Sequence, residues 1–428
     1  MKPLLFNSAL AATLAFFFPL SIAHAQEAAP TITDAIMAGK PIFEVRGRFE
    51  GVDQTGIANK GESATLRTRL GWETAEWNSF KALLEFEDVR QIGPEHYVIN
   101  VPGATTPSLN GVTGYPIIND PEGTELNRLQ LTWKPSANFS ATGGRQRILI
   151  DDQRFIGNVG WRQDEQTFDG VRMDGSLGKF KATYAYLSHI NRILGEERDW
   201  DSDSHLFNAT YALAEPLKLQ GFVYALDFSN SAANSSITMG AKASGKTWLS
   251  LFQVAYNATY AEQKDYRHNT PDYDLTYYGG DIAATFDIYT AKIGFESLEG
   301  NGTRGFTTPL ATTHAFQGWA DAFVSPGGNK SFVQGIEDLN FTVQMKPRFK
   351  FTYLFNPDFM IRYHDFNSER TGESIGSEWD LQATASITKQ LSILLKYANF
   401  EREAPTTVGG TPLPADREKF WVSFEYKL

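Results

Sequence analysis

The sequence contains no cysteine, so neither a disulfide nor a thiolate metal site contributes to its fold. After residue 26 it has no apolar run near the roughly 20 residues that a membrane-spanning helix needs. A formal net charge of −11 at pH 7 argues against a general nucleic-acid binder, and we expect no nucleic-acid partner. The sequence also has no phosphate-binding loop or dinucleotide fingerprint, and we expect no cofactor.

The first residues have the composition of a secretory signal peptide. Lys2 supplies the positive start, residues 4–22 are largely apolar, and Ala23-His24-Ala25 is a small-residue cleavage site. The alternative is an uncleaved membrane anchor. The cleavage site favours export, so any membrane span of the mature chain must be built from strands.

Beyond residue 42 the sequence alternates apolar and polar residues along segments of about 10 residues. Clear examples are residues 338–346, 379–388 and 420–428. One face of each segment is apolar and the other is polar. This pattern predicts strands with a lipid face and a water face, although a soluble β-sandwich also alternates because one sheet face packs on a core.

The connections between these segments distinguish the two folds. Short turns at residues 78–79, 215–216, 356–358 and 389–390 alternate with long loops such as 93–123 and 300–334. Short turns on one side and long loops on the other are typical of outer-membrane barrels, as is a high aromatic content, here 13%. We place the long outer loops after Asp53, Ile92, Ile150, Ile193, Ser229, Gln263, Glu299, Phe366 and Glu401.

The sequence therefore predicts an all-β protein, a transmembrane antiparallel up-and-down β-barrel of about 18 strands. Sixteen strands is the alternative, because residues 169–174 and 237–243 are weak strand segments. We divide the chain into a signal peptide (1–25), a short periplasmic lead (26–42) and the barrel (43–428). We expect it in the outer membrane of a Gram-negative bacterium, in contact with lipid and lipopolysaccharide.

If the apolar face meets lipid, the polar face identifies the residues of the lumen. The predicted positive lining is Arg46, Arg48, Arg67, Arg69, Arg128, Arg145, Arg147 and Arg172, opposed by Glu44, Glu85 and Asp174. The same alternation turns Lys292, Glu296, Arg362 and His364 inward. Rows of both signs either orient dipolar or anionic solutes in a hydrated pore, or pair across strands to stiffen the wall. The alternation leaves both interpretations open.

The stretch from Gly143 to Arg172 is the richest in Arg, Asp and Gln. Strict alternation from Phe139 aims Arg145 and Arg147 at lipid, which is costly near the midplane. A bulge at Gly143-Gly144 would turn both inward, and we predict one there. Residues 151–167 then form an outer loop. Its Arg154 and Arg162 are candidates for a constriction inside the pore, and a solvated cap is the alternative.

The sequence resembles the alginate-export family of outer-membrane porins in several motifs. They are GGRQRILIDDQRFIGNVGWRQDEQTFDGVR from Gly143, YGGDIAATFDIYTAKIGFESLEG leading into GFTTPLATTHAFQGWADAF from Gly305, GIEDL from Gly335, YHDF from Tyr363, SEWDLQATA, and REKFWVSFEYKL at the end. The resemblance extends over most of the chain from about Tyr115.

This resemblance implies a monomeric 18-stranded barrel that passes an anionic uronate polymer through an arginine-rich constriction. It also implies that residues 305–321 form a long outer loop packed over the barrel mouth. Family membership does not fix the solute, and an uptake porin for small organic acids or oligosaccharides has the same motifs. We therefore expect a transport channel for anionic solutes, with either class open.

Two further functions, a lipase and a metal site, are suggested by specific residues. His364 and Ser368 lie close in the sequence and suggest an outer-membrane lipase, but His364 follows the inward face of its strand whereas Ser368 lies in the loop, so we expect no enzyme. Residues 199–205, DWDSDSH, carry carboxylates but lack the Gly and terminal Glu of an EF-hand, so we predict a solvated loop and no metal site. A plugged surface-adhesion barrel is the remaining alternative.

Overall fold

The computed structural model describes residues 29–100, 108–269, 271–324, 330–348, 354–403 and 406–428. The predicted signal peptide and the first residues of the predicted lead lie outside the described residues. The described part of the lead contains helix α1 (Ile32–Met37), whose N-terminal cap is the Thr31 side chain, and strand β1 begins at Lys40. None of the helices described is long and apolar enough to cross a membrane.

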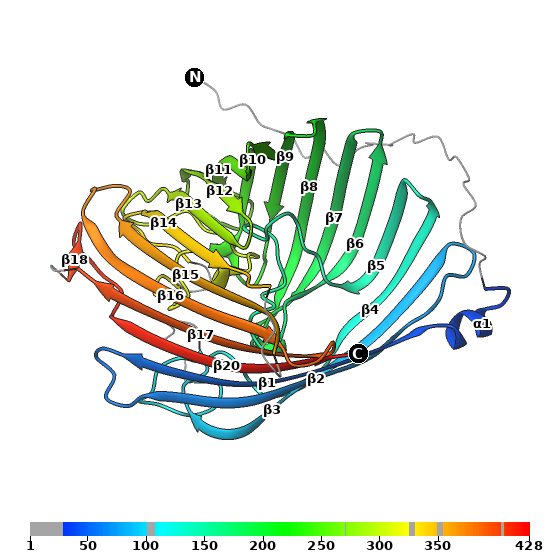
Figure 1. Ribbon diagram of the computed structural model, residues 1–428, viewed down its shortest axis with the longest axis horizontal. Helices are drawn as coiled ribbons and strands as arrows, with labels where there is room; N and C mark the ends of the chain where they lie inside the picture. Colours follow the sequence, from blue (N-terminus) through cyan, green and yellow to red (C-terminus); the bar gives the residue numbers. More distant parts are fainter. Residues whose placement is uncertain (1–28, 101–107, 270, 325–329, 349–353, 404–405) are drawn as a thin grey trace.

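Eighteen strands in the described residues form one antiparallel sheet that closes on itself. Its strands are β1 (Lys40–Gln54), β2 (Gly61–Glu73), β3 (Phe80–His96), β4 (Gly123–Ser136), β5 (Phe139–Gln146), β6 (Thr167–Leu177), β7 (Phe180–Asn191), β8 (Trp200–Ala214), β9 (Leu217–Leu226), β10 (Ser236–Leu249), β11 (Phe252–Asp265), β12 (Asp274–Phe286), β13 (Tyr289–Leu298), β14 (Ile336–Met345), β15 (Phe355–Asn367), β16 (Ser374–Ser386), β17 (Leu391–Arg402) and β20 (Arg417–Lys427). Figure 1 shows the closure, with the red end of the chain beside its blue beginning.

Closure is made by β1, which pairs with β2 on one side and with β20 on the other. Each strand therefore has two neighbours, so no backbone edge is left unpaired in the hydrocarbon layer, where an unsatisfied amide is costly. The prediction of an antiparallel barrel of 18 strands is confirmed. The two weak segments lie in β6 and β10, which decides against 16 strands.

The connections follow the predicted asymmetry. Two-residue turns join β4 to β5, β6 to β7, β8 to β9, β10 to β11 and β12 to β13, all at one end of the barrel. Longer loops follow β1, β3, β5, β7, β9, β11, β13, β15 and β17 at the other end. The last of these carries the small hairpin of β18 (Thr407–Val408) and β19 (Thr411–Pro412), and three single-turn 3-10 helices, Glu196–Arg198, Ala232–Asn234 and Thr313–Ala315, lie in the others.

Two local predictions were wrong. The turn predicted at Asn356-Pro357-Asp358 lies inside β15, where the pairing with β16 shifts register between Phe355 and Asp358. This irregularity accommodates Pro357, which has no N–H for the ladder. The bulge predicted at Gly143-Gly144 is also absent, since β5 keeps an unbroken register with β6 and, at these glycines, with β4.

The outer face of the barrel is apolar. Side chains such as Leu131, Ile293, Phe341 and Val343 are about half exposed and alternate with inward polar residues along their strands. This arrangement is what a hydrocarbon surrounding requires, because each strand can satisfy its backbone in the sheet and present only apolar side chains to lipid.

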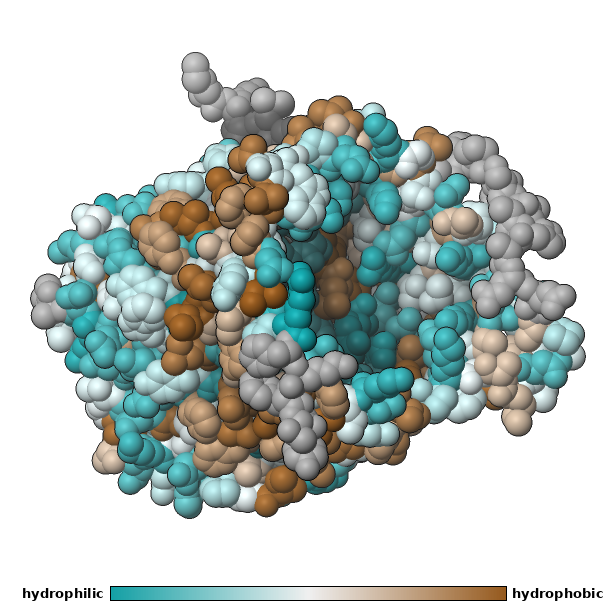
Figure 2. Space-filling view, in the orientation of Figure 1, coloured by the Kyte–Doolittle hydropathy of each residue, from teal (hydrophilic) through white to brown (hydrophobic). Residues whose placement is uncertain are grey.

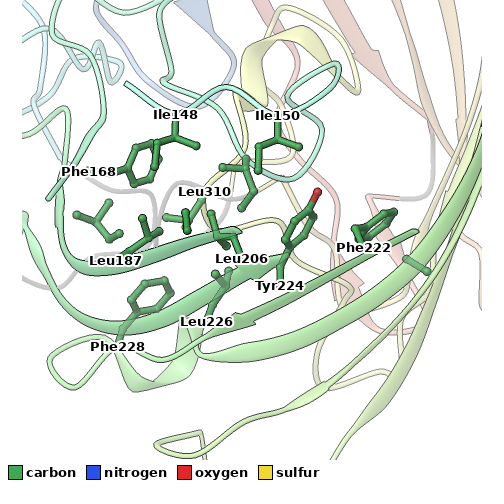
Figure 3. Close-up of a cluster of buried hydrophobic side chains, with 14 of the residues drawn as sticks. Ile148, Ile150, Phe168, Leu187, Leu206, Phe222, Tyr224, Leu226, Phe228 and Leu310 are labelled. Atoms are coloured by element: carbon green, nitrogen blue, oxygen red, sulfur yellow. The ribbon is translucent and has the colours of Figure 1, made fainter. Parts of the chain in front are cut away.

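Part of the inner wall is apolar as well. Leu187 on β7, Leu206 on β8 and Leu226 on β9 are fully or almost fully buried, and Ile148 and Leu310 from two loops cover them. Figure 3 shows these side chains gathered against the inside of the green strands. Burying them removes apolar surface from the water of the lumen, which favours the loops lying inside the barrel.

We predict that a charge on the lipid face of a central strand destabilises the barrel more than one near a turn. Ile293→Arg, in the middle of β13, should lower the free energy of unfolding by about 2–4 kcal/mol, and Leu213→Arg, at the end of β8, by about 0–1 kcal/mol. Reversible urea unfolding in lipid vesicles measures both. Equal losses for the two variants would contradict a membrane-facing outer surface.

Candidate functional site

Two long loops fold into the barrel lumen. The β5–β6 loop (residues 147–166) contacts opposite sides of the wall: Arg46 on β1 donates from Nε to Oε1 of Gln163 at 2.8 Å, and Arg154 donates from Nε to Oε1 of Glu296 on β13 at 3.0 Å. A segment that contacts β1 and β13 at once must cross the interior. The β13–β14 loop (residues 299–335, of which 325–329 lie outside the described residues) packs against it.

The two loops are joined by backbone and side-chain hydrogen bonds. Ile156 and Leu310 form a parallel β-bridge, and the N–H of Gly157 donates to the carbonyl of Leu310 at 2.8 Å. The hydroxyl of Thr312 donates to Oε1 of Gln153 at 2.7 Å. The predicted packing of residues 305–321 over the mouth is therefore replaced by packing within the lumen, between the β5–β6 loop and the wall.

Asp321 anchors the β13–β14 loop. Its carboxylate lies 3.0 Å from Nζ of Lys419 on β20, 3.2 Å from Nζ of Lys330 and 3.8 Å from the guanidinium of Arg162. Burial opposes ionisation of Asp321, but the hydrogen bond from His314 and the two ammonium groups outweigh it and hold the pKa of its carboxyl well below its usual value. The two loops and the wall thus meet at one buried charge.

Trp161 lies at the centre of the joined loops. Its ring stacks on His314 with ring centres 4.3 Å apart and an interplanar angle of 6°, and Trp421 packs edge-on against it. The guanidinium of Arg48 lies 4.3 Å and Nζ of Lys396 4.1 Å from the Trp161 ring centre. Desolvated cation–π contacts of this kind contribute about 2 kcal/mol each.

The four arginines of β1 and β2 lie beneath the β5–β6 loop. Arg46, Arg48, Arg67 and Arg69 face the interior but are only 2–7% exposed. Arg46 donates to the carbonyls of Gly160 and Arg162 as well as to Gln163. Arg67 lies 3.3 Å from Glu44 and 3.1 Å from Glu425, and Arg69 pairs with Glu87, Glu44 and Glu165. Arg46, Arg48 and Arg69 therefore hold the loop, Arg67 is paired within the wall, and none of the four is in contact with open water.

The other predicted lining residues are also paired. Arg128 forms a bidentate pair with Glu85 on the inner face, Arg172 pairs with Asp174 at 2.8 Å, and Arg147 pairs with Glu165, whose carboxyl is buried. Burial raises the pKa of Glu165, but Arg69 and Arg147 outweigh this and lower it to about 2.

The prediction that Arg145 lines the lumen was wrong. In register it lies opposite Leu129, an exposed residue of the outer face, and its guanidinium pairs with Asp169 at 2.8 and 3.0 Å. Because no bulge interrupts β5 at the glycines, its outward direction is kept. Arg145 is therefore not a lumen residue, and the pair with Asp169 neutralises it at the end of the strand.

The two candidate constriction arginines sit in the β5–β6 loop. Arg154 is 3% exposed, donates to Glu296 and Thr308, and lies over the ring of Phe316 at 4.7 Å. Arg162 lies 2.8 Å from Glu50. Burial lowers the pKa of Arg162, but nearby carboxylates outweigh it and raise the pKa above its usual value. Both guanidiniums are paired and serve to position the loop.

The loops leave a cavity of about 120 Å³ against the wall of β9 to β15. Its lining includes Asp151, Asp152, Arg154, Phe155, Gln220, Phe222, Tyr224, Lys242, Asp281, Lys292, Glu296, Phe316, Asp338, Arg362 and His364. Figure 2 shows that the molecule is hollowed near the centre of this view, with hydrophilic residues along much of the hollow. This cavity is the candidate functional site.

Most charges of the cavity are paired. Lys242 contacts Asp151 at 2.6 Å and Asp152 at 2.7 Å, and Lys292 lies 3.5 Å from Asp281. Arg362 differs: its Nε donates to the hydroxyl of Thr342 at 3.0 Å. Among the described residues, no carboxylate lies within ion-pair distance of its guanidinium.

Sequence reasoning placed Lys292, Glu296, Arg362 and His364 inward but did not find the aromatic part of the cavity. Phe222 and Tyr224 on β9 also face the interior. Assigning every apolar residue to lipid missed them. The alternation along β9 could have identified them, because Lys218 and Gln220 precede Phe222 and Tyr224 on the same inward face.

The lipase alternative finds no support in the geometry. The hydroxyl of Ser368 donates to the carbonyl of Gln334 at 2.7 Å, and His364 bonds to Asp338 at 2.7 Å. Ser368 and His364 are therefore committed to different partners. The acidic segment predicted as a solvated loop also differs, since from Trp200 onward it belongs to β8.

The architecture is shared with solved outer-membrane porins. OccAB4 of Acinetobacter baumannii is 11% identical with a TM-score of 0.68, over 91% of this chain and 98% of OccAB4. OccK9 (OpdG) of Pseudomonas aeruginosa is 11% identical with a TM-score of 0.67, over 92% of this chain and 100% of OccK9. OpdK of the same species, solved with vanillate, is 12% identical with a TM-score of 0.62, over 92% and 99%.

An 18-stranded closed antiparallel barrel with an apolar outer belt is the architecture of a transmembrane β-barrel, and it is the fold that this chain shares with OccAB4. No curated protein matches the sequence. The chain belongs to the alginate export family, which it matches over residues 42–290. The match begins well before the motifs that carry the sequence resemblance and ends before the insert at 305–321.

We predict that acid loosens the β13–β14 loop through His314. Burial lowers the pKa of His314 well below its usual value; Asp321 opposes this shift and Lys396 adds to it. The neutral ring suits the site, since Nδ1 faces Asp321 at 3.1 Å and Nε2 faces Nζ of Lys396 at 2.9 Å. A depressed histidine pKa contributes stability that is complete above pH about 6.5 and falls by about 1.4 kcal/mol per pH unit below it, down to the pKa of the docked ring.

Single-channel currents should therefore fluctuate more at pH 5.5 than at pH 7.5. The variant His314→Asn should lose most of this dependence, whereas His96→Asn, at an exposed histidine, should retain it. Identical pH profiles for the wild type and His314→Asn would exclude His314 as the group responsible.

Proposed function

We propose that the protein is a passive outer-membrane channel for anionic solutes, and that solutes pass through the cavity beside Arg362. The preferred solutes are carboxylates, either small organic acids or the uronate units of a polysaccharide. Membership of the alginate export family supports the uronate class. The protein supplies position and charge and no chemical step.

The observation that carries the proposal is that the guanidinium of Arg362 has no carboxylate partner among the described residues. Its Nε donates to Thr342, Sδ of Met360 lies 3.9 Å from Nη2, and the ring centre of Trp319 lies 5.5 Å from Cζ. A guanidinium recognises a carboxylate through two parallel N–H donors, which is the geometry left open here. The other cations of the cavity are occupied by protein carboxylates, so an incoming anion meets Arg362 without displacing one.

The size of the cavity bears on the class of solute. The cavity beside Arg362 is about 120 Å³, which is small beside the roughly 300–1,000 Å³ of typical ligand pockets. This size favours small acids. A uronate polymer would have to pass as a single extended strand.

A second candidate is passage of aromatic carboxylates. Phe155, Phe222 and Tyr224 form a contiguous aromatic group on the cavity wall, with Phe155 and Phe222 ring centres 5.0 Å apart. An aromatic acid could stack there while its carboxylate reaches toward the cations. The similar fold of OpdK, solved with vanillate, makes this class worth testing beside uronates.

We predict that Arg362→Gln weakens block of the channel by carboxylates. A charge-assisted hydrogen bond contributes about 1.5–3 kcal/mol, which corresponds to about 10- to 100-fold in affinity. Concentration-dependent block by glucuronate, by short uronate oligomers and by vanillate is measured in a planar bilayer, together with the anion-to-cation permeability ratio. The wild type should prefer anions, and the variant should lose part of that preference.

The matched control is Arg348→Gln. Arg348 is 78% exposed and pairs with Asp287 at a turn, away from the cavity, so its removal should leave block and selectivity unchanged. Equal block of the wild type and Arg362→Gln by all three solutes would refute a recognition role for Arg362. An absence of current would instead favour a plugged barrel.

A further inference from the structure

Three carboxylates meet where the β5–β6 loop touches the wall. Glu87 on β3, Glu125 on β4 and Asp164 in the loop each place an oxygen within 4.8 Å of the other two. Glu87 and Glu125 are direct cross-strand partners in the register of β3 and β4. Like charges directly opposite each other destabilise a strand pair, so this arrangement needs an additional positive charge.

The nearby protein cations do not supply it. Arg69 lies against Glu87 and is shared with Glu44 and Glu165, and Arg67, 3.9 Å from Glu87, is shared with Glu44 and Glu425. Neither Glu125 nor Asp164 has an ion pair with an Arg, Lys or His among the described residues. Glu125 and Asp164 therefore have no directly paired cation in the part of the chain that the structure describes.

The second observation is the burial of Asp164. Its side chain is 7% exposed, and its Oδ1 has no hydrogen-bond partner among the described residues. Nor is any N–H or O–H donor of those residues seen on its other oxygen. A buried carboxylate without a donor or a cation is strongly disfavoured, so its position between two further carboxylates points to a bound cation.

We propose that Glu87, Glu125 and Asp164 bind one divalent cation, with Ca²⁺ the preferred ion, and that this ion fastens the β5–β6 loop to the wall. Oxygens that share one Ca²⁺ at about 2.4 Å each lie at most about 4.8 Å apart, and this group meets that limit. Three carboxylates offer up to six oxygens to an ion that takes six to eight, and Asp164 supplies the ligand from the loop.

The position of the site explains why a cation there would hold the pore. The residue before Asp164, Gln163, bonds to Arg46 and Thr65 on the wall, and the residue after it, Glu165, bonds to Arg147 and accepts from Asn127. An ion at Asp164 would complete a row of three consecutive loop residues bound to β1 through β4. The ion is thus a structural clamp, separate from the solute cavity at Arg362.

The test is equilibrium binding of Ca²⁺ to the purified protein in detergent, free of lipopolysaccharide, with Tb³⁺ luminescence as a second probe and Mg²⁺ as a competitor. The wild type should bind one Ca²⁺ per chain. Even residues that only support metal ligands contribute about 10- to 100-fold to metal affinity. Asp164→Asn and Glu125→Gln should therefore each weaken binding at least about tenfold.

The matched controls are Asp272→Asn and Glu197→Gln, which remove exposed acids from other outer loops and should leave binding unchanged. Two ligand variants are used so that a folding defect in one does not decide the result, and the wild-type stoichiometry is informative by itself. No stoichiometric binding to the wild type, or unchanged binding in both ligand variants, would overturn the proposal and leave the carboxylates sharing protons.

Discussion

The buried carboxylate of Asp321 is the contact on which the interior of this barrel depends. A barrel in lipid places its apolar side chains outside, so charged groups gather within it and must be compensated there. Asp321 meets Lys419 of the wall, Lys330 of its own loop and Arg162 of the β5–β6 loop. Removing it would leave the buried ammonium of Lys330 without a carboxylate and leave Lys419 and Arg162 to share Glu50, which costs more than the pair contributes.

Compensation of the lumen charges explains how the pore is shaped. The arginines of β1 and β2 are paired with wall carboxylates or hydrogen-bonded to carbonyls of the β5–β6 loop, so this side of the lumen is filled. On the other side, β9 to β15, the loops leave a cavity in which the guanidinium of Arg362 has no carboxylate partner among the described residues. The lumen is therefore asymmetric, and the abundance of arginine on a strand does not identify the side that the loops leave open.

The period-two pattern was sufficient to predict the barrel and its loop asymmetry and to favour 18 strands over 16, because the alternation is a property of each strand by itself. The same alternation placed Arg46 and Arg362 inside. It could not distinguish a covered arginine from an open one, because Arg46 contacts Gln163, 117 residues away in the chain. The prediction for Arg145 was wrong for a local reason. The paired glycines suggested a bulge that would turn its side chain inward, but the strand pairing stays regular and Asp169 neutralises the charge on the outer face.

The central claim is that the two loops lie joined inside the lumen in the resting channel. It can be tested by the double variant Ile156→Cys with Leu310→Cys, because these residues are bridged partners and the chain has no other cysteine. Single-channel conductance would be measured before and after oxidation. The account predicts an efficient cross-link that leaves the conductance unchanged. Failure to cross-link, or a conductance that falls sharply when the bond forms, would show that the loops lie apart in the conducting channel.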